Sequence, residues 1–211
     1  MTTLSDYITD CRRLLHDANG NFYSDSLLTS YINDARMREV RDTGCLRDLQ
    51  SDTALYNQET YDFATLARGD RTIDLLNINL IWGNTRIPLR YLPWTQFNAE
   101  LRFWENYNGR PIAFSMYGPK KYYLGPKPDQ TYSMELDTVY LPEEMTSAND
   151  VETIPDPFTS PIPFYACYKA KYFEQSFGEA EIFKQQYMLQ TQSVLNSTFT
   201  RRMPNPYSTP Y

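Results

Sequence analysis

The sequence is poor in the residue types that most metal sites and catalytic triads require. It contains one histidine, His16, and three cysteines, Cys11, Cys45 and Cys167, which lie far apart. A zinc site needs clustered Cys and His ligands, and most nucleophilic triads need a His general base. We therefore expect no metal site, no cofactor, a histidine at a helix end and three buried thiols in a reducing compartment.

Long apolar runs are also lacking. No stretch approaches the roughly 18 to 20 apolar residues of a membrane span, and Met1–Asp6 has neither the basic nor the apolar region of a signal peptide. The eight glycines form no phosphate-binding loop. The sequence thus predicts a soluble protein that is made and assembled in the cytoplasm without membrane contact.

Positive charge is sparse and dispersed. The formal net charge is −6, and no more than two Lys or Arg residues are adjacent, which disfavours a surface that grips nucleic acid. Aromatic residues are abundant, because they make up 15% of the 211 residues and include 18 tyrosines. Tyrosine combines a large apolar area with a polar tip, so this composition indicates interfaces with other proteins.

Amphipathic helices are predicted at both ends of the chain. Apolar residues recur every three or four positions from Leu4 to Leu15, after Thr3 as N-cap, and again in a helix that begins at Ser24 and ends at Gly44. Two later stripes are Ile162, Tyr165, Tyr168 and Tyr172, and Ala180, Phe183, Tyr187 and Val194. Because all four stripes need partners, we expect residues 1–52 and 143–196 to pack into one helical core.

The middle of the chain, residues 53–142, has the pattern of a small antiparallel β unit. Short alternating or apolar runs are separated by polar turns, and Gly83-Asn84 between β-forming residues predicts a two-residue hairpin. Pro93 opens a predicted helix near residues 93–107, which Asn108-Gly109 ends. The sequence therefore predicts an α+β fold in which a four-helix core from both chain ends carries an inserted β unit with one helix.

The last segment, residues 197–211, differs in composition. Its prolines disfavour helix and central strand, and its apolar surface is too small to fold alone. We expect an extended C-terminal arm that binds a partner protein, and a frayed terminus is the alternative. The residues expected to make its contacts are Phe199, Arg201, Arg202, Tyr207 and Tyr211.

Candidate catalytic residues are few. A glycosidase needs two carboxylates across a sugar-sized gap, and the candidates beside aromatic residues or in loops are Glu100, Glu105, Glu143 and Glu144. Charges on a helix normally face water, and no serine has the context of a nucleophile elbow. We therefore expect that the protein is not an enzyme and has no catalytic residues.

The order of several motifs resembles a known family. The N-terminal motifs are Leu4-x-x-Tyr7-Ile8, Leu14-Leu15-x-Asp17 and Leu28 followed by Tyr31-Ile32-Asn33-x-Ala35. The later ones are Tyr122–Pro128, the strand Met134–Tyr140, and Ile154-Pro155 before a helix that contains Tyr and Ala. Each motif alone is common, but their order over most of the chain resembles the head-to-tail adaptor proteins of tailed phages, the group that includes tail tubular protein A of short-tailed phages.

This resemblance implies a structural virion protein at the head-to-tail junction. In the family, a dodecameric ring of subunits binds beneath the portal protein, receives the tail or nozzle protein, and leaves a channel for DNA ejection. The chain would then be one subunit of a homo-oligomeric ring through which DNA passes without specific binding. Carboxylates that face such a channel would repel phosphates.

Two other functions remain open on the sequence. Some adaptors of this kind hydrolyse peptidoglycan, so the chain could be a cell-wall hydrolase carried by the virion. It could also be a non-viral binding module whose Pro- and Tyr-rich tail is the ligand of an aromatic groove.

Overall fold

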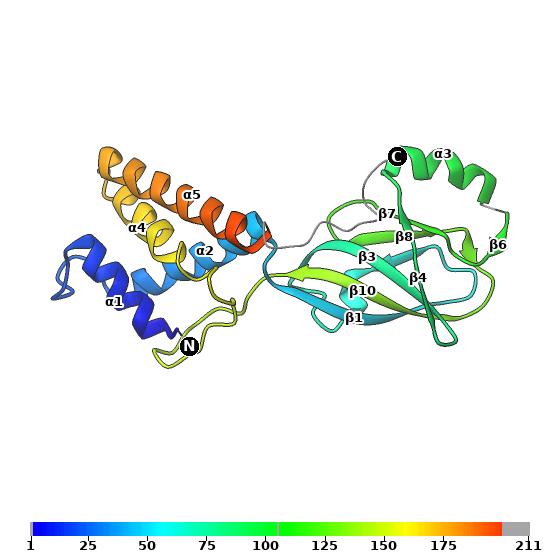
Figure 1. Ribbon diagram of the computed structural model, residues 1–211, viewed down its shortest axis with the longest axis horizontal. Helices are drawn as coiled ribbons and strands as arrows, with labels where there is room; N and C mark the ends of the chain where they lie inside the picture. Colours follow the sequence, from blue (N-terminus) through cyan, green and yellow to red (C-terminus); the bar gives the residue numbers. More distant parts are fainter. Residues whose placement is uncertain (1, 105, 200–211) are drawn as a thin grey trace. The chain divides into compact units, whose positions relative to one another are not determined.

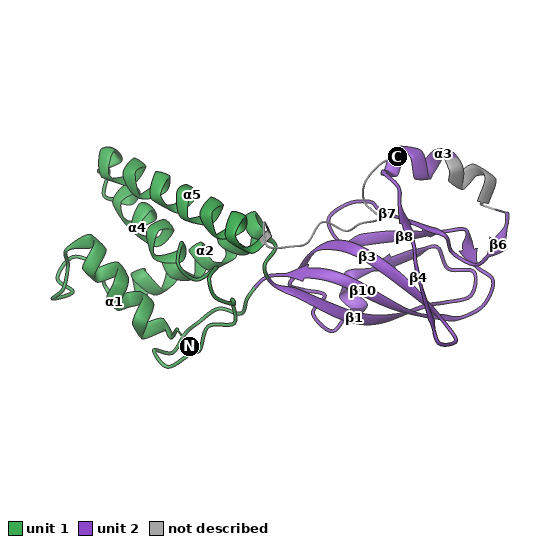
Figure 2. Ribbon diagram, viewed as in Figure 1, with its two compact units in different colours: residues 1–45, 142–211 green, residues 46–141 purple. Residues whose placement is uncertain are grey.

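The chain folds as an α+β protein with two compact units. The computed structural model describes residues 2–104 and 106–199, without the side chains of residues 100–104 and 199. Residues 1–45 and 142–211 make up the helical unit, and residues 46–141 make up the β unit, which is inserted between the two parts of the helical unit in the sequence (Figures 1 and 2).

Helices from both chain ends share the core of the helical unit. In the described residues this unit contains α1 (Leu4–Leu15), α2 (Asp25–Thr43), α4 (Ile162–Phe173) and α5 (Phe177–Phe199). Helix α4 packs against the other three helices, and α1 also contacts α2, which confirms the expected four-helix core. Among the described residues, no helix combines the length and the apolar composition that crossing a membrane requires.

The ends of α1 and α2 follow the predicted capping signals. Thr3 Oγ1 accepts a hydrogen bond from the Asp6 N–H at 3.3 Å, and the Asp6 carboxylate accepts one from the Thr3 N–H at 2.8 Å, which closes a capping box. Ser24 Oγ accepts from the Leu27 N–H at 3.3 Å at the start of α2. Gly44 ends α2 with φ 61°, a left-handed conformation that glycine adopts without steric cost.

The buried face of α4 differs from the predicted stripe. The tyrosines of that stripe are half-buried or exposed, whereas Ile162, Ala166, Cys167 and Ala170 are buried. Small side chains allow α1 and α2 to approach α4 closely. Two adjacent faces of α4 carry apolar periodicity, and the tyrosines of the predicted stripe lie on the outer one.

Two predicted boundaries are also corrected. Strand β1 (Arg47–Ala54) begins inside the segment that was assigned to the N-terminal helix pair. Its alternation is hidden because the inward position at Gln50 is polar, and this side chain is satisfied by Thr138 Oγ1 at 2.7 Å. Helix α5 continues to Phe199, so the segment from residue 197 begins as helix and not as an extended arm.

The described β unit contains two four-stranded sheets and one two-stranded sheet. The first sheet has the order β1, β10 (Tyr132–Tyr140), β3 (Thr72–Trp82) and β4 (Thr85–Pro88), all antiparallel. The second has the order β2 (Thr60–Asp62), β8 (Lys121–Gly125), β7 (Ala113–Met116) and β5 (Arg90–Tyr91). The expected antiparallel arrangement is incomplete, because β5 pairs with β7 in parallel, as does β6 (Asn108–Gly109) with β9 (Lys127–Pro128).

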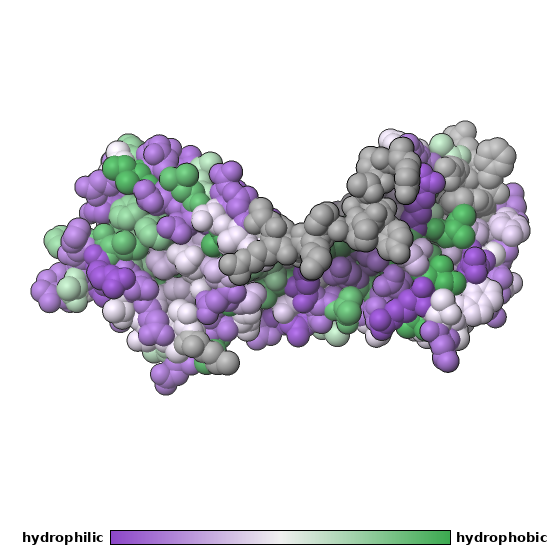
Figure 3. Space-filling model, viewed as in Figure 1, coloured by the Kyte–Doolittle hydropathy of each residue, from purple (hydrophilic) through white to green (hydrophobic). Residues whose placement is uncertain are grey.

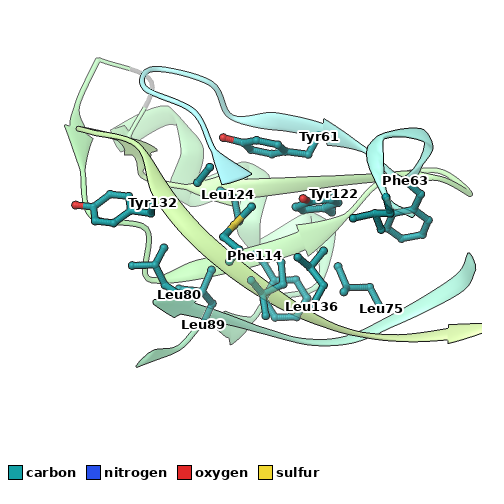
Figure 4. Close-up of a cluster of buried hydrophobic side chains, with 14 residues drawn as sticks. Tyr61, Phe63, Leu75, Leu80, Leu89, Phe114, Tyr122, Leu124, Tyr132 and Leu136 are labelled. Carbon is teal, nitrogen blue, oxygen red and sulfur yellow. The ribbon is translucent and has the colours of Figure 1, made fainter. Parts of the chain in front are cut away.

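The hydrophobic core of the β unit lies between the two four-stranded sheets (Figure 4). Leu80 and Leu136 project into it from the first sheet, and Phe114, Tyr122 and Leu124 project from the second. The period-2 alternation of each strand places these residues on one face. The predicted hairpin between β3 and β4 is present, because Trp82 pairs with Thr85 and Gly83 has φ 58°.

Helix α3 (Trp94–Trp104) covers the outer face of the second sheet. Phe97 is buried there with Leu92 and Ala113, and the Trp94 ring lies 4.8 Å from the Tyr123 ring. The predicted helix over 93–107 is therefore present but shorter. It ends before β6 because Asn108-Gly109 pairs with β9.

A buried ion pair attaches the returning chain to α2. Arg36 Nε and Nη2 donate to the two carboxylate oxygens of Glu152 at 2.7 and 2.8 Å, and the side chains are only 1% and 2% exposed. Arg36 Nη1 also donates to the Glu143 carbonyl at 2.7 Å and to Asn33 Oδ1 at 3.0 Å. Burial raises the pKa of Glu152, but the hydrogen bonds and charge of Arg36 outweigh it and hold the pKa below its usual value.

We predict that Arg36→Met destabilises the chain by about 3 to 5 kcal/mol, because it leaves the Glu152 carboxylate buried without its cation. The matched control is Arg38→Met on the same helix, which removes the more exposed pair with Asp42 and should cost less than about 1 kcal/mol. Urea unfolding followed by circular dichroism gives both values. Equal losses of unfolding free energy in the two variants would contradict the prediction that the buried Arg36 pair stabilises the chain more than the exposed Arg38 pair.

Candidate docking surfaces

Four exposed aromatic side chains lie around one end of the helical unit. Phe22 is 81% exposed, Phe173 65%, Phe177 59% and Tyr172 50%. The rings of Tyr172 and Phe177 are 5.6 Å apart, and those of Tyr172 and Phe173 are 6.3 Å apart. Hydrophobic residues gather over α4 and α5 (Figure 3). We call Phe22, Tyr172, Phe173 and Phe177 the aromatic end.

The loop that carries Phe22 is held rigidly. The Asp17 carboxylate accepts hydrogen bonds from the N–H groups of Asn21, Phe22 and Tyr23, at 2.9, 3.3 and 3.0 Å. These bonds, together with the charge of Arg12, hold the pKa of Asp17 below its usual value. Arg12 also donates to the Tyr23 carbonyl at 3.0 Å. The exposed phenylalanine therefore sits on a preformed loop, so its binding to a partner would cost little ordering entropy.

Charged groups surround the aromatic end. Tyr23 Oη donates to Glu174 at 2.8 Å, which fixes the loop beside the C-terminal end of α4. Lys171 lies 3.1 Å from Glu174 and 3.0 Å from Glu179. An apolar centre with a charged rim is the usual anatomy of a protein interface.

A second surface feature is a groove along α1 and α2. It has a volume of about 580 Å³ and an apolar floor that includes Leu4, Ile8 and Met145. Its other lining residues are Asp25, Ser26, Thr29, Ser30, Asn33, Asp34, Glu144, Thr146 and Ala148. We call this cavity the α1–α2 groove. Its position was not anticipated from the sequence, because its wall comes from a loop more than 100 residues away.

Two of the four carboxylates considered for catalysis, Glu143 and Glu144, are described, and they are neighbours in the loop after the β unit. Glu144 lines the α1–α2 groove, and the backbone carbonyl of its neighbour Glu143 accepts from Arg36. The side chains of Glu100 and Glu105 lie outside the described residues. Within residues 2–104 and 106–199, no three His, Cys, Asp or Glu side chains gather into a possible metal site.

The cysteines and the histidine follow the sequence predictions in part. Cys11 and Cys167 are buried free thiols, and Cys167 Sγ lies 3.8 Å from the Cys11 carbonyl. Cys45 is also a free thiol but is only partly buried. His16 is the C-cap residue of α1, with φ 56°.

The β unit carries its own exposed aromatic site at the end of β3. Trp82 is 47% exposed, the Arg110 guanidinium lies 5.0 Å from its ring centroid, and the Tyr132 ring lies 5.9 Å away. A cation stacked on indole limits the motion of both side chains. This pair presents a large, partly exposed ring at the end of the hairpin.

Glu39 is a buried carboxylate between α2 and α5. Thr191 Oγ1 donates to Glu39 Oε2 at 3.0 Å, and Glu39 Oε1 accepts no hydrogen bond from the described part of the chain. Burial raises the pKa of Glu39 to about 7, although the bond from Thr191 and the nearby Tyr187 hydroxyl partly oppose the shift. Beside it, Tyr187 Oη donates to Asp42 at 2.9 Å.

The residues expected to form the C-terminal arm are described only at their start. Phe199 is the last residue of α5. Arg201, Arg202, Tyr207 and Tyr211 lie outside the described residues.

The family comparison covers nearly the whole chain. A family model described as SU10 adaptor protein matches residues 2–209, which include both the helical and the β unit. A comparison with curated proteins finds no match.

We predict that Glu39 makes the free energy of unfolding fall as the pH rises. The folded chain holds this proton more tightly than the unfolded chain, so stability is lost between the ordinary value of 4.5 and about 7. The full effect is about 3 kcal/mol, since each pKa unit corresponds to about 1.4 kcal/mol.

The measurement is the difference in urea midpoint between Glu39→Gln and the wild type at pH 5 and at pH 8. We expect the glutamine variant to gain relative stability at pH 8. Glu174→Gln is the control of opposite sign, because bonds from Tyr23 and Lys171 lower the pKa of Glu174. A Glu39→Gln difference that does not change with pH would contradict the prediction.

Proposed function

The chain belongs to the SU10 adaptor protein family, and we propose that it acts as one subunit of a ring between the portal and the tail of a phage. Family membership makes it a phage adaptor and supports a structural role at the head-to-tail junction of the virion, in association with portal and tail proteins. The ring, its dodecameric size and a central channel for DNA ejection are our proposal.

The observation that carries the proposal is the presence of two different docking surfaces on the helical unit. A ring subunit that also binds a portal needs separate surfaces for the neighbouring subunit and for the portal. The aromatic end projects apolar side chains, whereas the α1–α2 groove is hollow and bears acidic residues. In this proposal the helical unit forms the ring wall and contacts the portal through the aromatic end.

The β unit is proposed to meet the tail or nozzle protein. Support comes from the Trp82 site, where a stacked Arg110 presents a large ring at the end of a hairpin. Trp and Arg are the residue types that most often dominate binding energy at interfaces.

DNA is proposed to pass through the ring without specific binding. The net charge of −6 supports this, because carboxylates on the channel surface would repel phosphates. We expect acidic residues to outnumber basic ones on that surface.

The C-terminal arm is proposed to contact the portal or a neighbouring subunit. Its proline-rich sequence pre-sets an extended backbone and so reduces the entropy lost on docking. Phe199 would mark its junction with α5, and Arg201, Arg202, Tyr207 and Tyr211 would make the contacts.

We predict no catalytic turnover. The two candidate carboxylates whose side chains are described, Glu143 and Glu144, lie next to each other in the loop after the β unit and do not face each other across a sugar-sized gap. The purified chain should release no sugar fragments from peptidoglycan above the level of Glu144→Gln. Fragment release that this substitution abolishes would support a cell-wall hydrolase instead.

The ring and the aromatic end are tested with purified portal protein. We predict that the wild type adds a mass of about twelve subunits to the portal, measured by native mass spectrometry. Phe22→Ser with Phe177→Ser should keep the melting temperature, since both side chains are exposed, and weaken portal binding about ten-fold or more.

The control for this experiment is Tyr56→Ser in the β unit, where the side chain is 63% exposed. Failure of the wild type to bind portal would contradict the proposed function. Equal binding by the aromatic variant and the control would contradict only the assignment of the aromatic end.

A further inference from the structure

The α1–α2 groove is a preformed site on the helical unit. Asn33 fixes its floor, because the side-chain amide donates to the Met145 carbonyl and accepts from the Met145 N–H, both at 2.9 Å. The adjoining wall is held to the start of α1, since the Ser5 N–H donates to the Ala148 carbonyl at 3.1 Å. Leu4 and Met145 are 2% and 3% exposed, so the floor is packed from below.

We propose that this groove receives the C-terminal segment, residues 200–211, of a second copy of the chain. The inference rests on the proposed ring and names one contact within it. The groove is lined by acidic residues, and segment 200–211 is basic.

Charge complementarity is the first argument. Three carboxylates line the groove, those of Asp25, Asp34 and Glu144, and its lining contains no Lys or Arg. The segment 200–211 contains two arginines and no acidic side chain. Arg12 and Lys169 already pair with Asp25 and Asp34, whereas no ion pair of Glu144 occurs among the described residues. Glu144 is therefore the groove carboxylate most open to an incoming guanidinium.

The second argument is the form of the segment. Its three prolines favour an extended backbone whose carbonyl groups point outward and have no internal partners. Hydroxyl groups of Ser26 and Ser30 line the groove and can donate to such carbonyls, whereas the Thr29 hydroxyl donates to the Asp25 carbonyl at 2.7 Å. Met203 would then cover the apolar floor beside the arginines. The groove volume of about 580 Å³ lies within the range of sites that bind small ligands, so it holds a few side chains of the segment.

The positions of the helices favour a second copy as the source of the segment. Tyr31 of α2 stacks on Phe173 at the C-terminal end of α4, with ring centroids 5.7 Å apart, so α2 and α4 are antiparallel. Helix α5 reverses direction after α4 and crosses the C-terminal half of α2, where Tyr187 bonds to Asp42 and Thr191 to Glu39 (Figure 1). The groove lies on the N-terminal half of α2.

The segment of the same chain starts from the other half of α2. After Thr191 bonds to Glu39, α5 continues for eight residues to Phe199, or about 12 Å. The groove residues Asn33 and Asp34 lie five or six residues before Glu39 on α2. The two arginines follow Phe199 within three residues, about 10 Å of extended chain. We therefore assign the groove to the arginines of an adjacent copy.

The test is a charge exchange in the full-length chain, read as oligomer mass without portal. We expect Glu144→Lys and Arg202→Glu each to raise the concentration needed for assembly at least ten-fold, and the combined variant to restore most of it. Glu143→Lys is the matched control, because this exposed neighbour does not line the groove. Melting temperatures should be unchanged.

A mixing experiment distinguishes the two sources of the segment. Glu144→Lys supplies an intact segment, and a chain without residues 200–211 supplies an intact groove. Each alone should stay monomeric, and a 1:1 mixture should form dimers. Dimers would support the second copy; unchanged monomers, or assembly by Glu144→Lys alone, would overturn the proposal. Portal binding is measured separately, so loss of the groove contact with retained portal binding leaves the proposed function intact.

Discussion

The structure of the helical unit depends on the buried pair between Arg36 and Glu152. The two residues are separated by 116 positions because the β unit is inserted between them. The pair attaches the segment that follows the β unit to α2. A salt bridge with both partners almost fully buried is costly to desolvate, so its geometry has to be satisfied completely. Here the guanidinium uses each of its nitrogens, with the Glu143 carbonyl and Asn33 as additional acceptors.

This constraint also produces the α1–α2 groove. Arg36 bonds to Glu143 and Glu152 at the two ends of the loop that contains Glu144, and Asn33, one turn away on α2, bonds to Met145. The position of the loop on α2 is fixed, because the Asn33 side chain bonds to both the N–H and the carbonyl of Met145. The cavity beneath it therefore exists before any partner arrives, and binding would not have to order this wall.

The sequence was sufficient to predict features that depend on local interactions. The N-caps Thr3 and Ser24, the glycine that ends α2 and the hairpin at Gly83 all come from short-range rules, and the structure contains each of them. Long-range features were not predictable in the same way. A polar inward residue hid the start of β1, and the Arg36 pair joins positions whose proximity no periodicity reveals. The exposure of Phe22 could have been suspected, because it lies between two predicted helices next to Asn and Gly.

The two surfaces of the helical unit have different physical characters, and this difference bears on assembly. A self-complementary patch would allow copies to close into isologous dimers, which would compete with a ring. The apolar side chains of the aromatic end cannot form ion pairs with the acidic residues of the α1–α2 groove. Two grooves would repel each other, because both are lined by carboxylates. Like-charge repulsion thus opposes the symmetric contact, whereas a basic segment from a neighbouring copy removes it. The charge pattern of this chain therefore favours contacts that propagate in one direction, as a closed ring requires.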